Sequence, residues 1–442
     1  MASAGLADLP ELAFEFSADG ICMQTAADRV EPVVAGFSSY QKWVIGLLAF
    51  LQFTIILDFM ILSPLGAILM PGLGISPAQF GLVVAAYAFS AGVSGFAAAG
   101  FADRFDRKRL LLIFYGGFVA GTLMCGVAHT YGFLLLARTV TGVFAGIVGS
   151  TVSAITTDLF AYQVRGRVLG IVQTAFAASN VVGVPLALAL SNRWGWNAPF
   201  LLIVAVGALV GVAAMRYLRP IDAHLQQHPD RSPVHHFLHT VSTPWYLQGF
   251  AATALLATGG FMLMPYSSAF LVHNLGIEFG RLPLVYTITG VCSIVAGPLI
   301  GRASDALGKF SVFSFGCAAT IAMVLIYTNL GVTPIGLVIL VNCLLFVGVF
   351  SRMIPASALI SAIPAPADRG AYMSISSSVQ QVSGGFAAIV GGLIVSESAT
   401  GALEHFDIVG YVLVGTTLVT LAMMYFISRR IEQAAKSNPA SS

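Results

Sequence analysis

Long apolar runs dominate this chain, and short polar breaks separate them. Three stretches, 59–102, 232–277 and 310–351, contain no Asp, Glu, Lys or Arg. Each is long enough for one or two helices of about 20 residues, the length that crosses a bilayer. The runs are too continuously apolar for the strands of a membrane barrel, which alternate over about ten residues. The pattern therefore predicts an all-α membrane protein.

Twelve apolar segments are candidates for membrane-spanning helices. Hydrocarbon offers the backbone no hydrogen-bond partners, so each span must satisfy its own backbone, as a helix does. We expect the rest of the chain to form a mobile cytoplasmic tail at 1–41, a cytoplasmic linker at 218–244 and a second cytoplasmic tail at 429–442. The twelve segments cover residues 42–70, 78–101, 109–128, 131–158, 165–190, 197–217, 245–272, 282–303, 310–328, 333–355, 370–396 and 406–428.

Charge is scarce, and its placement predicts the orientation. Only 9% of the residues are charged, against about a quarter in soluble domains. If the first residue is cytoplasmic, Arg193 and Arg281 lie outside, Arg138 lies within a helix, and Arg352 ends a helix as a base that reaches the cytoplasmic surface. The other 17 of the 21 Lys and Arg residues (21 minus these 4) are then cytoplasmic, in agreement with the positive-inside rule. Both termini are therefore expected in the cytoplasm.

Neither a metal site nor a cleavable signal peptide is predicted. The linker is rich in histidine, and such a cluster can bind metal, but a polar connection is the expected role. The five cysteines show no metal-ligand spacing and are expected to be small buried hydrophobes. The first 38 residues hold six acids and one base, whereas a signal peptide begins basic and becomes apolar.

An internal repeat divides the chain into two halves. Asp103 follows the second segment and Asp305 follows the eighth, 202 residues apart, while Arg165 opens the fifth and Arg369 opens the eleventh, 204 apart. Two offsets that nearly agree predict two related six-helix bundles with a substrate site at their interface. The halves are expected at 42–217 and 245–428.

The loop after the second segment resembles the signature loop of the major facilitator superfamily. The sequence AGFADRFDRKR at 99–109 follows the pattern G-x-x-x-D-R-x-G-R-[RK], with Ala99 and Asp106 where the family usually has Gly. The sequence LLLARTVTG at 134–142 looks like the family's fourth-helix motif. The resemblance implies the major facilitator fold of two pseudo-symmetric six-helix bundles.

Two further motifs resemble one branch of that family. Asp58 followed by Pro64 resembles the first-helix motif of the drug:proton antiporters. Gly183-Val-Pro185 resembles the fifth-helix antiporter motif, with Val inserted between Gly and Pro. Together with WGWNAPF at 194–200, this variant is similar to the sugar-efflux and arabinose-efflux-like permeases.

Asp58 and Arg138 are the candidate proton-coupling residues. Asp58 stands in the first segment within a long uncharged run, and an intramembrane acid costs about 2.5–3.5 kcal/mol on the insertion scale. It can avoid that cost by facing water, by pairing or by taking up a proton; a permanent hydrogen bond between helices is the alternative. Arg138 cannot readily lose its charge, so it must pair or reach water. The resemblance implies that Arg138 lies near the first-helix acid, and an interfacial position is its alternative.

The loop cluster is a candidate conformational latch. Arg107 could pair with Asp158 at the end of the fourth segment, and Asp103 could cap a helix of the other half. Both contacts would hold the outward-open state and break on inward opening. A basic loop that only fixes topology is the alternative. The predicted latch residues are Asp103, Arg104, Arg107, Lys108, Asp158 and Asp305.

Other residues could shape the fifth helix or contact substrate. Gly183 and Pro185 are expected to bend that helix, because Pro removes a backbone donor. Polar or adaptable side chains elsewhere are candidate substrate contacts, with hydrogen bonding between helices as the alternative. These are Phe53, Met60, Gln173, Asn180, Tyr266, Asn342, Gln380 and Gln381.

No phosphate loop, hydrolase elbow or helical metal motif occurs in the sequence, so we predict neither an enzyme nor a cofactor, and the proton gradient is the expected energy source. The leading expectation is a monomeric proton-coupled exporter of a drug, sugar or metabolite in a bacterial inner membrane. Its expected partners are the small-molecule substrate, protons and the lipid bilayer, and no nucleic acid. Uptake by proton symport or facilitation uses the same fold. A non-transporting membrane sensor is the alternative of another class.

Overall fold

The computed structural model describes residues 37–102, 105–160, 162–222, 239–365, 368–398 and 401–437. Residues Trp43–Ser442 belong to one compact unit, which contains nearly all of the helical bundle. Most of the predicted tail at 1–41 and of the predicted linker at 218–244 lies outside the described residues. The proposed domain boundaries therefore stay predictions.

The first half of the described chain contains six helical spans, and the fifth is built from three consecutive pieces. The first four spans are α1 (Ser39–Leu73), α2 (Pro77–Phe101), α3 (Arg107–Gly126) and α4 (Tyr131–Leu159). The fifth span consists of α5 (Tyr162–Ala178), η2 (Ser179–Gly183) and α6 (Val184–Trp194), and the sixth is α7 (Ala198–Tyr217).

The second half of the described chain also contains six spans, together with a short antiparallel hairpin in which Ser396 faces Glu404. In order, the elements are α9 (Pro244–Leu263) with η4 (Met264–Tyr266) and α10 (Ser267–His273), η5 (Phe279–Arg281) with α11 (Leu282–Leu307), α12 (Lys309–Thr328), α13 (Ile335–Ser361), α14 (Arg369–Ile394), β1 (Ser396–Glu397), β2 (Leu403–Glu404) and α15 (Phe406–Ser437).

Within the described residues, eleven of these spans are long and apolar enough to cross a membrane. The twelfth, α14, has 26 residues, and its serines and glutamines make it less apolar than the others. It packs between α2 and α9 as an integral member of the bundle. The predicted all-α fold of twelve transmembrane helices is confirmed.

The tenth span runs further than the sequence predicts. The hydrophobic pattern ends this helix at 355, whereas α13 continues through Pro355 to Ser361. Membrane helices tolerate Pro where neighbouring groups satisfy the freed backbone. Arg352 therefore lies inside the helix with 5% of its surface exposed. The expectation that it reaches the cytoplasmic surface is wrong.

Local caps fix where several helices begin. Ser76 caps α2 by accepting a hydrogen bond from the Gln79 N–H, and the Gln79 side chain accepts from the Ser76 N–H in return. Thr130 caps α4 by accepting from the Phe133 N–H. These bonds satisfy backbone donors that the first turn leaves without intrahelical partners.

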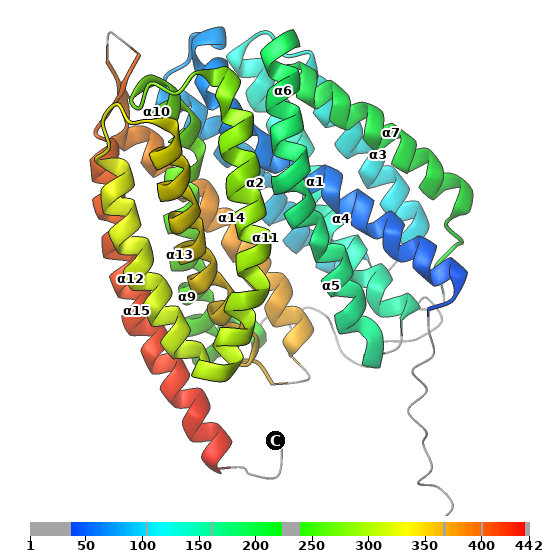
Figure 1. Cartoon of the computed structure of the whole chain (residues 1–442). Coiled ribbons are helices and arrows are strands. Elements are labelled where there is room, and N and C mark those ends of the chain that lie inside the picture. Colours follow the sequence, from blue (N-terminus) through cyan, green and yellow to red (C-terminus); the bar gives the residue numbers. More distant parts are fainter. Residues whose placement is uncertain are drawn as a thin grey trace, which may run out of the picture. The chain divides into compact units, whose positions relative to one another are not determined.

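The two halves meet along two pairs of helices. α2 packs against α14, and α11 packs against η2 and α6 (Figure 1). Glycines bring the first pair close: an added Cβ at Gly92 would lie 2.9 Å from Val382 Cγ2, and one at Gly392 would lie 2.7 Å from the Pro77 carbonyl oxygen. Small residues allow this close approach between membrane helices.

Candidate functional site

Asp58 and Arg138 form an ion pair inside the first half. Arg138 Nη1 of α4 donates to Asp58 Oδ2 of α1 at 2.8 Å and to the Asp58 backbone carbonyl oxygen at 3.3 Å. The Arg138 and Asp58 side chains are 1% and 0% exposed. Because a guanidinium keeps its charge in proteins, the Asp58 carboxyl is the member of this pair whose charge can change.

An aromatic ring connects the ion pair to the second half. Arg138 Cζ lies 4.3 Å from the centre of the Tyr87 ring on α2, a cation–π contact. Phe59 packs 5.4 Å from the Tyr87 ring and 5.5 Å from the Phe261 ring of α9, centre to centre. Sequence reasoning missed Tyr87, because an aromatic residue in an apolar run is ordinary. The chain of contacts therefore runs from the ion pair to the opposite half.

Three polar atoms in this site lack partners. Asp58 Oδ1, Arg138 Nε and the Tyr87 hydroxyl have no hydrogen-bond partner among the described residues. Buried polar groups are nearly always hydrogen-bonded, so each exception calls for an explanation. A second arrangement of the helices, or a bound molecule, could supply the missing partners.

Serine side chains join the two halves at one end of the bundle. Ser268 Oγ of α10 donates to the Ser63 carbonyl oxygen of α1 at 2.8 Å and accepts from the Ala67 N–H at 3.3 Å. Ser63 Oγ donates in turn to the Met264 carbonyl oxygen. These bonds hold α1 against the residues at which η4 ends and α10 begins.

Tyr266, predicted to contact substrate, lies in the same contact between halves. Its side chain is fully buried. Its hydroxyl donates to the Ala388 carbonyl oxygen of α14 at 2.7 Å, and its ring packs edge-on against Phe80 of α2 at 6.1 Å. We call this region the sealed end. It comprises residues 63–81 of the first half and residues 264–268 and 388–392 of the second.

The opposite end of the bundle is joined less closely. We call it the tail end, where Trp43 packs against Tyr217 at 5.7 Å and Arg430 packs on the Trp245 ring at 4.3 Å. There α11 contacts α5 only sparsely, since it packs mainly on η2 and α6. The arrangement is therefore closed at the sealed end.

The predicted latch is described in part. Arg107 Nε donates to Asp158 Oδ2 at 2.9 Å, and Arg107 Nη1 donates to the Ala102 carbonyl oxygen at 2.9 Å. This pair joins α3 to α4 and so lies within one half. Lys108 is half-buried, and Asp305 is exposed on α11 without an ion pair to any described residue. Asp103 and Arg104 lie outside the described residues.

Asp106, which replaces the family's usual Gly, has a structural role that sequence reasoning missed. Its Oδ1 accepts from the Arg109 N–H at 2.8 Å and caps α3, while its Oδ2 accepts from the Ile221 N–H at 2.9 Å. The Arg107 N–H donates to the Ile221 carbonyl oxygen at 3.1 Å. The segment after α7 is thereby tied to the start of α3.

The fifth span changes its winding where Gly183 and Pro185 were expected to bend it. Residues Ser179–Gly183 form a π-helical turn before α6 begins. An added Cβ at Gly183 would lie 2.6 Å from Leu57 Cδ1 of α1. π-helical turns inside α-helices occur frequently at functional sites. This one lies where the fifth span meets both α1 and α11.

The other residues predicted to contact substrate do not lie in one cluster within the described part of the chain. Asn180 Nδ2 lies 3.6 Å from Met60 Sδ and donates to the Phe176 carbonyl oxygen at 3.0 Å. Asn342 is buried and donates to the Val338 carbonyl oxygen. The remaining members have partial or full exposure: Phe53, Gln380 and Gln381 are half-buried, and Gln173 is exposed.

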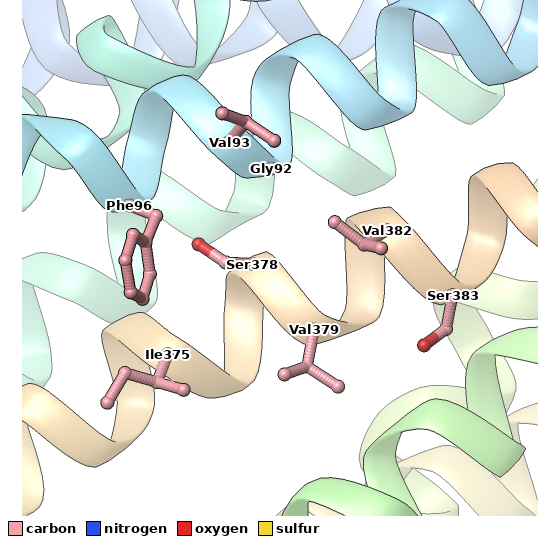
Figure 2. A pocket seen from close by; sticks show the side chains of 8 residues that line it. All are labelled: Gly92, Val93, Phe96, Ile375, Ser378, Val379, Val382 and Ser383. Carbon is pink, nitrogen blue, oxygen red and sulfur yellow. The ribbon is translucent and has the colours of Figure 1, made fainter. Parts of the chain in front are cut away.

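A cavity of about 300 Å³ lies between α2 and α14 (Figure 2). Its lining is mainly apolar and comes from both halves. None of the substrate contacts predicted from the sequence lines it. The lining residues are Gly92, Val93, Phe96, Ile375, Ser378, Val379, Val382 and Ser383.

Known proteins that resemble this chain are transporters of one family. The family model of the Major Facilitator Superfamily matches residues 48–351 and again 249–442. The uncharacterized MFS-type transporter YceJ of Bacillus subtilis (strain 168) is 27% identical over 60% of this chain and 67% of its own length. A protein described as a probable sugar efflux transporter of Mannheimia succiniciproducens is 22% identical over 78% of this chain and 83% of its own length.

Among solved structures, a mutant of the nucleoside transporter NupG shares the fold. Its TM-score is 0.72 and its identity 15%, over 87% of this chain and 99% of that one. At this identity the likeness concerns the architecture of the helices alone.

Proposed function

Because this chain belongs to the major facilitator superfamily, we propose that it exports a small molecule in exchange for protons by alternating access. Membership in this family indicates the general activity, which is secondary transport of a small-molecule substrate across a membrane. The fold leaves the energy source and the direction open. The proposal of proton coupling rests on one observation, the buried ion pair of Asp58 and Arg138.

The pair suits a proton carrier because its attraction depends on the carboxyl charge. Asp58 is the single buried acid among the described residues. Protonation of Asp58 removes the negative charge that Arg138 Nη1 contacts at 2.8 Å. Removing one charge of a buried ion pair costs about 3–5 kcal/mol, because the other charge stays buried without a partner. A proton at Asp58 therefore favours helix positions in which Arg138 finds other partners. Arg138 Nε, which has no partner among the described residues, is available for them.

The contacts of this site offer a route to the opposite half. Arg138 stacks on Tyr87, and Phe59 packs on both Tyr87 and Phe261. A shift of Arg138 would therefore disturb packing between α1, α2 and α9 near the sealed end. If proton binding and substrate binding favour different positions of the halves, each changes the affinity for the other by the same factor.

The positive-inside rule supports an orientation with the tail end in the cytoplasm. In that orientation the sealed end faces outward, and the described arrangement is inward-facing. The Arg107–Asp158 pair is then intact in the inward-facing arrangement. A latch that breaks on inward opening would need contacts other than this pair.

Export is supported by the first- and fifth-helix motifs and by the name of one relative, a probable sugar efflux transporter. A bacterial inner membrane and a monomer remain part of the proposal. Uptake by symport would use the same pair with the opposite direction of substrate movement.

Liposomes that contain the purified protein and an internal pH-sensitive dye test the proposal. A thermal-stabilisation screen of sugars, cationic drugs and metabolites first supplies a substrate. An imposed substrate gradient should then move protons in the opposite direction. Asp58→Asn should bind the substrate but lose proton movement, whereas Glu404→Gln, which alters an exposed acid, should behave as the unmodified protein.

Three results would contradict the proposal. Unchanged pH-dependent transport by Asp58→Asn would remove Asp58 from the coupling step. Proton and substrate moving in the same direction would make the protein a symporter. Substrate binding without any flux would favour a sensor.

A further inference from the structure

Arg352 stands apart from the other buried arginines of the described chain. Three arginines are buried there, Arg107, Arg138 and Arg352. Arg107 pairs with Asp158, and Arg138 pairs with Asp58. No Asp or Glu of the described residues pairs with Arg352, whose Nη1 donates instead to Thr417 Oγ1 of α15 at 3.0 Å. Its Nε has no partner among the described residues.

The second half provides no buried acid as a partner for Arg352. None of its described Asp and Glu side chains is buried. A guanidinium stays charged in proteins, and a buried charge without a partner is strongly unfavourable. A negative charge that balances Arg352 would therefore come from outside the described residues. The acids in question are Glu278, Asp305, Asp368, Glu397, Glu404, Asp407 and Glu432.

Gly259 of α9 places no side chain of its own beside the guanidinium. An added Cβ there would lie 3.7 Å from Arg352 Nη2 and 3.4 Å from Leu413 Cγ of α15. The neighbouring Gly260 is exposed and has nothing within 4 Å of an added Cβ, so it does not border Arg352. Gly259 is therefore the position of the two at which a larger side chain would meet the guanidinium.

We propose that Arg352 forms a binding site for one small monovalent anion in the second half, between α9, α13 and α15. A single guanidinium balances one negative charge, and a dianion would leave an unbalanced charge in the bundle. Arg352 offers Nε and its remaining Nη hydrogens as a planar fork, which suits a carboxylate and also a halide. The anion is either dissolved halide or the carboxylate of an organic solute, including a transported one. The site is independent of proton coupling at Asp58.

The site is tested by thermal unfolding of the purified full chain during titration with sodium chloride or sodium benzoate. Sodium isethionate, a bulky salt, keeps the ionic strength constant. The unmodified protein should show a saturable rise in Tm with at least one of the two anions, because a ligand that binds only the folded state stabilises it. Arg352→Gln should weaken the apparent affinity about tenfold or more, the effect of losing a charge-assisted contact worth about 1.4 kcal/mol or more.

Matched variants keep the test decisive. Arg281→Gln alters an exposed arginine that pairs with Glu278, and it should titrate as the unmodified protein. If Arg352→Gln does not fold, Gly259→Val fills the space beside Nη2 without removing the charge and should exclude the anion. Gly260→Val, the same change at the adjacent position with open space, should leave binding intact.

The anion that saturates at the lower concentration identifies its source. Tighter benzoate binding assigns the site to an organic carboxylate, and tighter chloride binding assigns it to a halide; both support the proposal. No saturable response to either anion in the unmodified protein would overturn it. Equal titrations of Arg352→Gln and the unmodified protein, or of Gly259→Val and Gly260→Val, would also overturn it.

Discussion

Ser268 of α10 donates its hydroxyl hydrogen to the Ser63 carbonyl oxygen of α1 at 2.8 Å, and so joins the two halves of the bundle through uncharged groups. The same oxygen of Ser268 accepts from the Ala67 N–H. Contacts of this kind are worth about 0.5–1.5 kcal/mol each. They can therefore hold the sealed end closed and still release it during a transport cycle.

Ser268→Ala should shift the protein toward arrangements that are open at the sealed end. Loss of about 1 kcal/mol changes a two-state population about fivefold. Spin labels at Arg193→Cys and Val332→Cys, exposed positions in the two halves, would report a larger population at long distance.

The matched control is Ser267→Ala. The Ser267 hydroxyl donates to the Leu263 carbonyl oxygen one turn earlier, within the second half. Its loss should leave the distance distribution unchanged. Equal effects of the two variants would show that the Ser268 contact between halves does not hold the sealed end.

The energy of the Asp58–Arg138 pair is measurable by a double-mutant cycle. Arg138→Gln leaves a buried carboxylate and should lower stability by about 3–5 kcal/mol near neutral pH, because one charge of a buried pair loses its partner. The double variant Asp58→Asn with Arg138→Gln should be more stable than Arg138→Gln alone, since neither charge remains. Thermal unfolding in detergent measures both single variants and the double variant.

Additive effects in that cycle would contradict a direct energetic coupling of the pair. Additivity is expected only for residues that share no contact, whereas these side chains lie 2.8 Å apart.

Asp106→Gly, which restores the residue usual in the family's loop, should destabilise the start of α3. The change removes the cap on the Arg109 N–H and the bond to the Ile221 N–H. Capping residues contribute about 0.5–2 kcal/mol, although Gly itself recovers part of this. Proteolytic cleavage after α7 should become faster, because the segment loses its tie.

Asp106→Asn separates the cap from the bond to the segment after α7. Asn is nearly as good a cap as Asp, but its amide nitrogen cannot accept from the Ile221 N–H as Oδ2 does, so this variant should keep α3 capped and still be cleaved faster than the unmodified protein. Cleavage of Asp106→Asn at the original rate would show that the cap alone holds the segment.

Gly183→Ala should lower the stability of the fifth span against α1. Its Cβ would lie 2.6 Å from Leu57 Cδ1, too close unless Leu57 moves, and overpacking typically costs about 1–3 kcal/mol. A lower Tm of the purified protein would report this cost.

Gly170→Ala is the matched control in α5, where nothing lies within 4 Å of an added Cβ. Ala is favoured over Gly in a helix by about 0.5–1 kcal/mol, so the Tm should stay equal or rise. A Gly183→Ala variant as stable as Gly170→Ala would mean that the contact with Leu57 is easily relieved.

Much of the fold was predictable because hydropathy is a local property. A bilayer imposes a minimum length on apolar helices, and charge-free runs such as 59–102 already reveal where they lie. The offsets of 202 and 204 residues between loop acids and helix-opening arginines indicated two halves, and the family model matches the chain twice. The end of α13 was missed because Pro355 does not interrupt a packed membrane helix.

The candidate site was predictable only where a residue is anomalous in its surroundings. Asp58 and Arg138 are charges in apolar runs, and such residues need a partner. Tyr87, Ser63 and Ser268 are ordinary in membrane helices, so nothing in the sequence singles them out. Their importance comes from the atoms that they contact in other helices.

Residue types along the chain were enough to establish the membrane setting, the twelve helices and the duplication, since each depends on short-range composition or on a constant offset. The pairing of charges became known only from the packed bundle. Arg138 meets Asp58 at 2.8 Å, whereas Arg352, equally embedded in an apolar helix, meets Thr417 and no described carboxylate. Pairing depends on the rotation and depth of each helix against its neighbours. Because packing over the whole bundle sets the rotation and depth of each helix, hydropathy along one segment does not determine them.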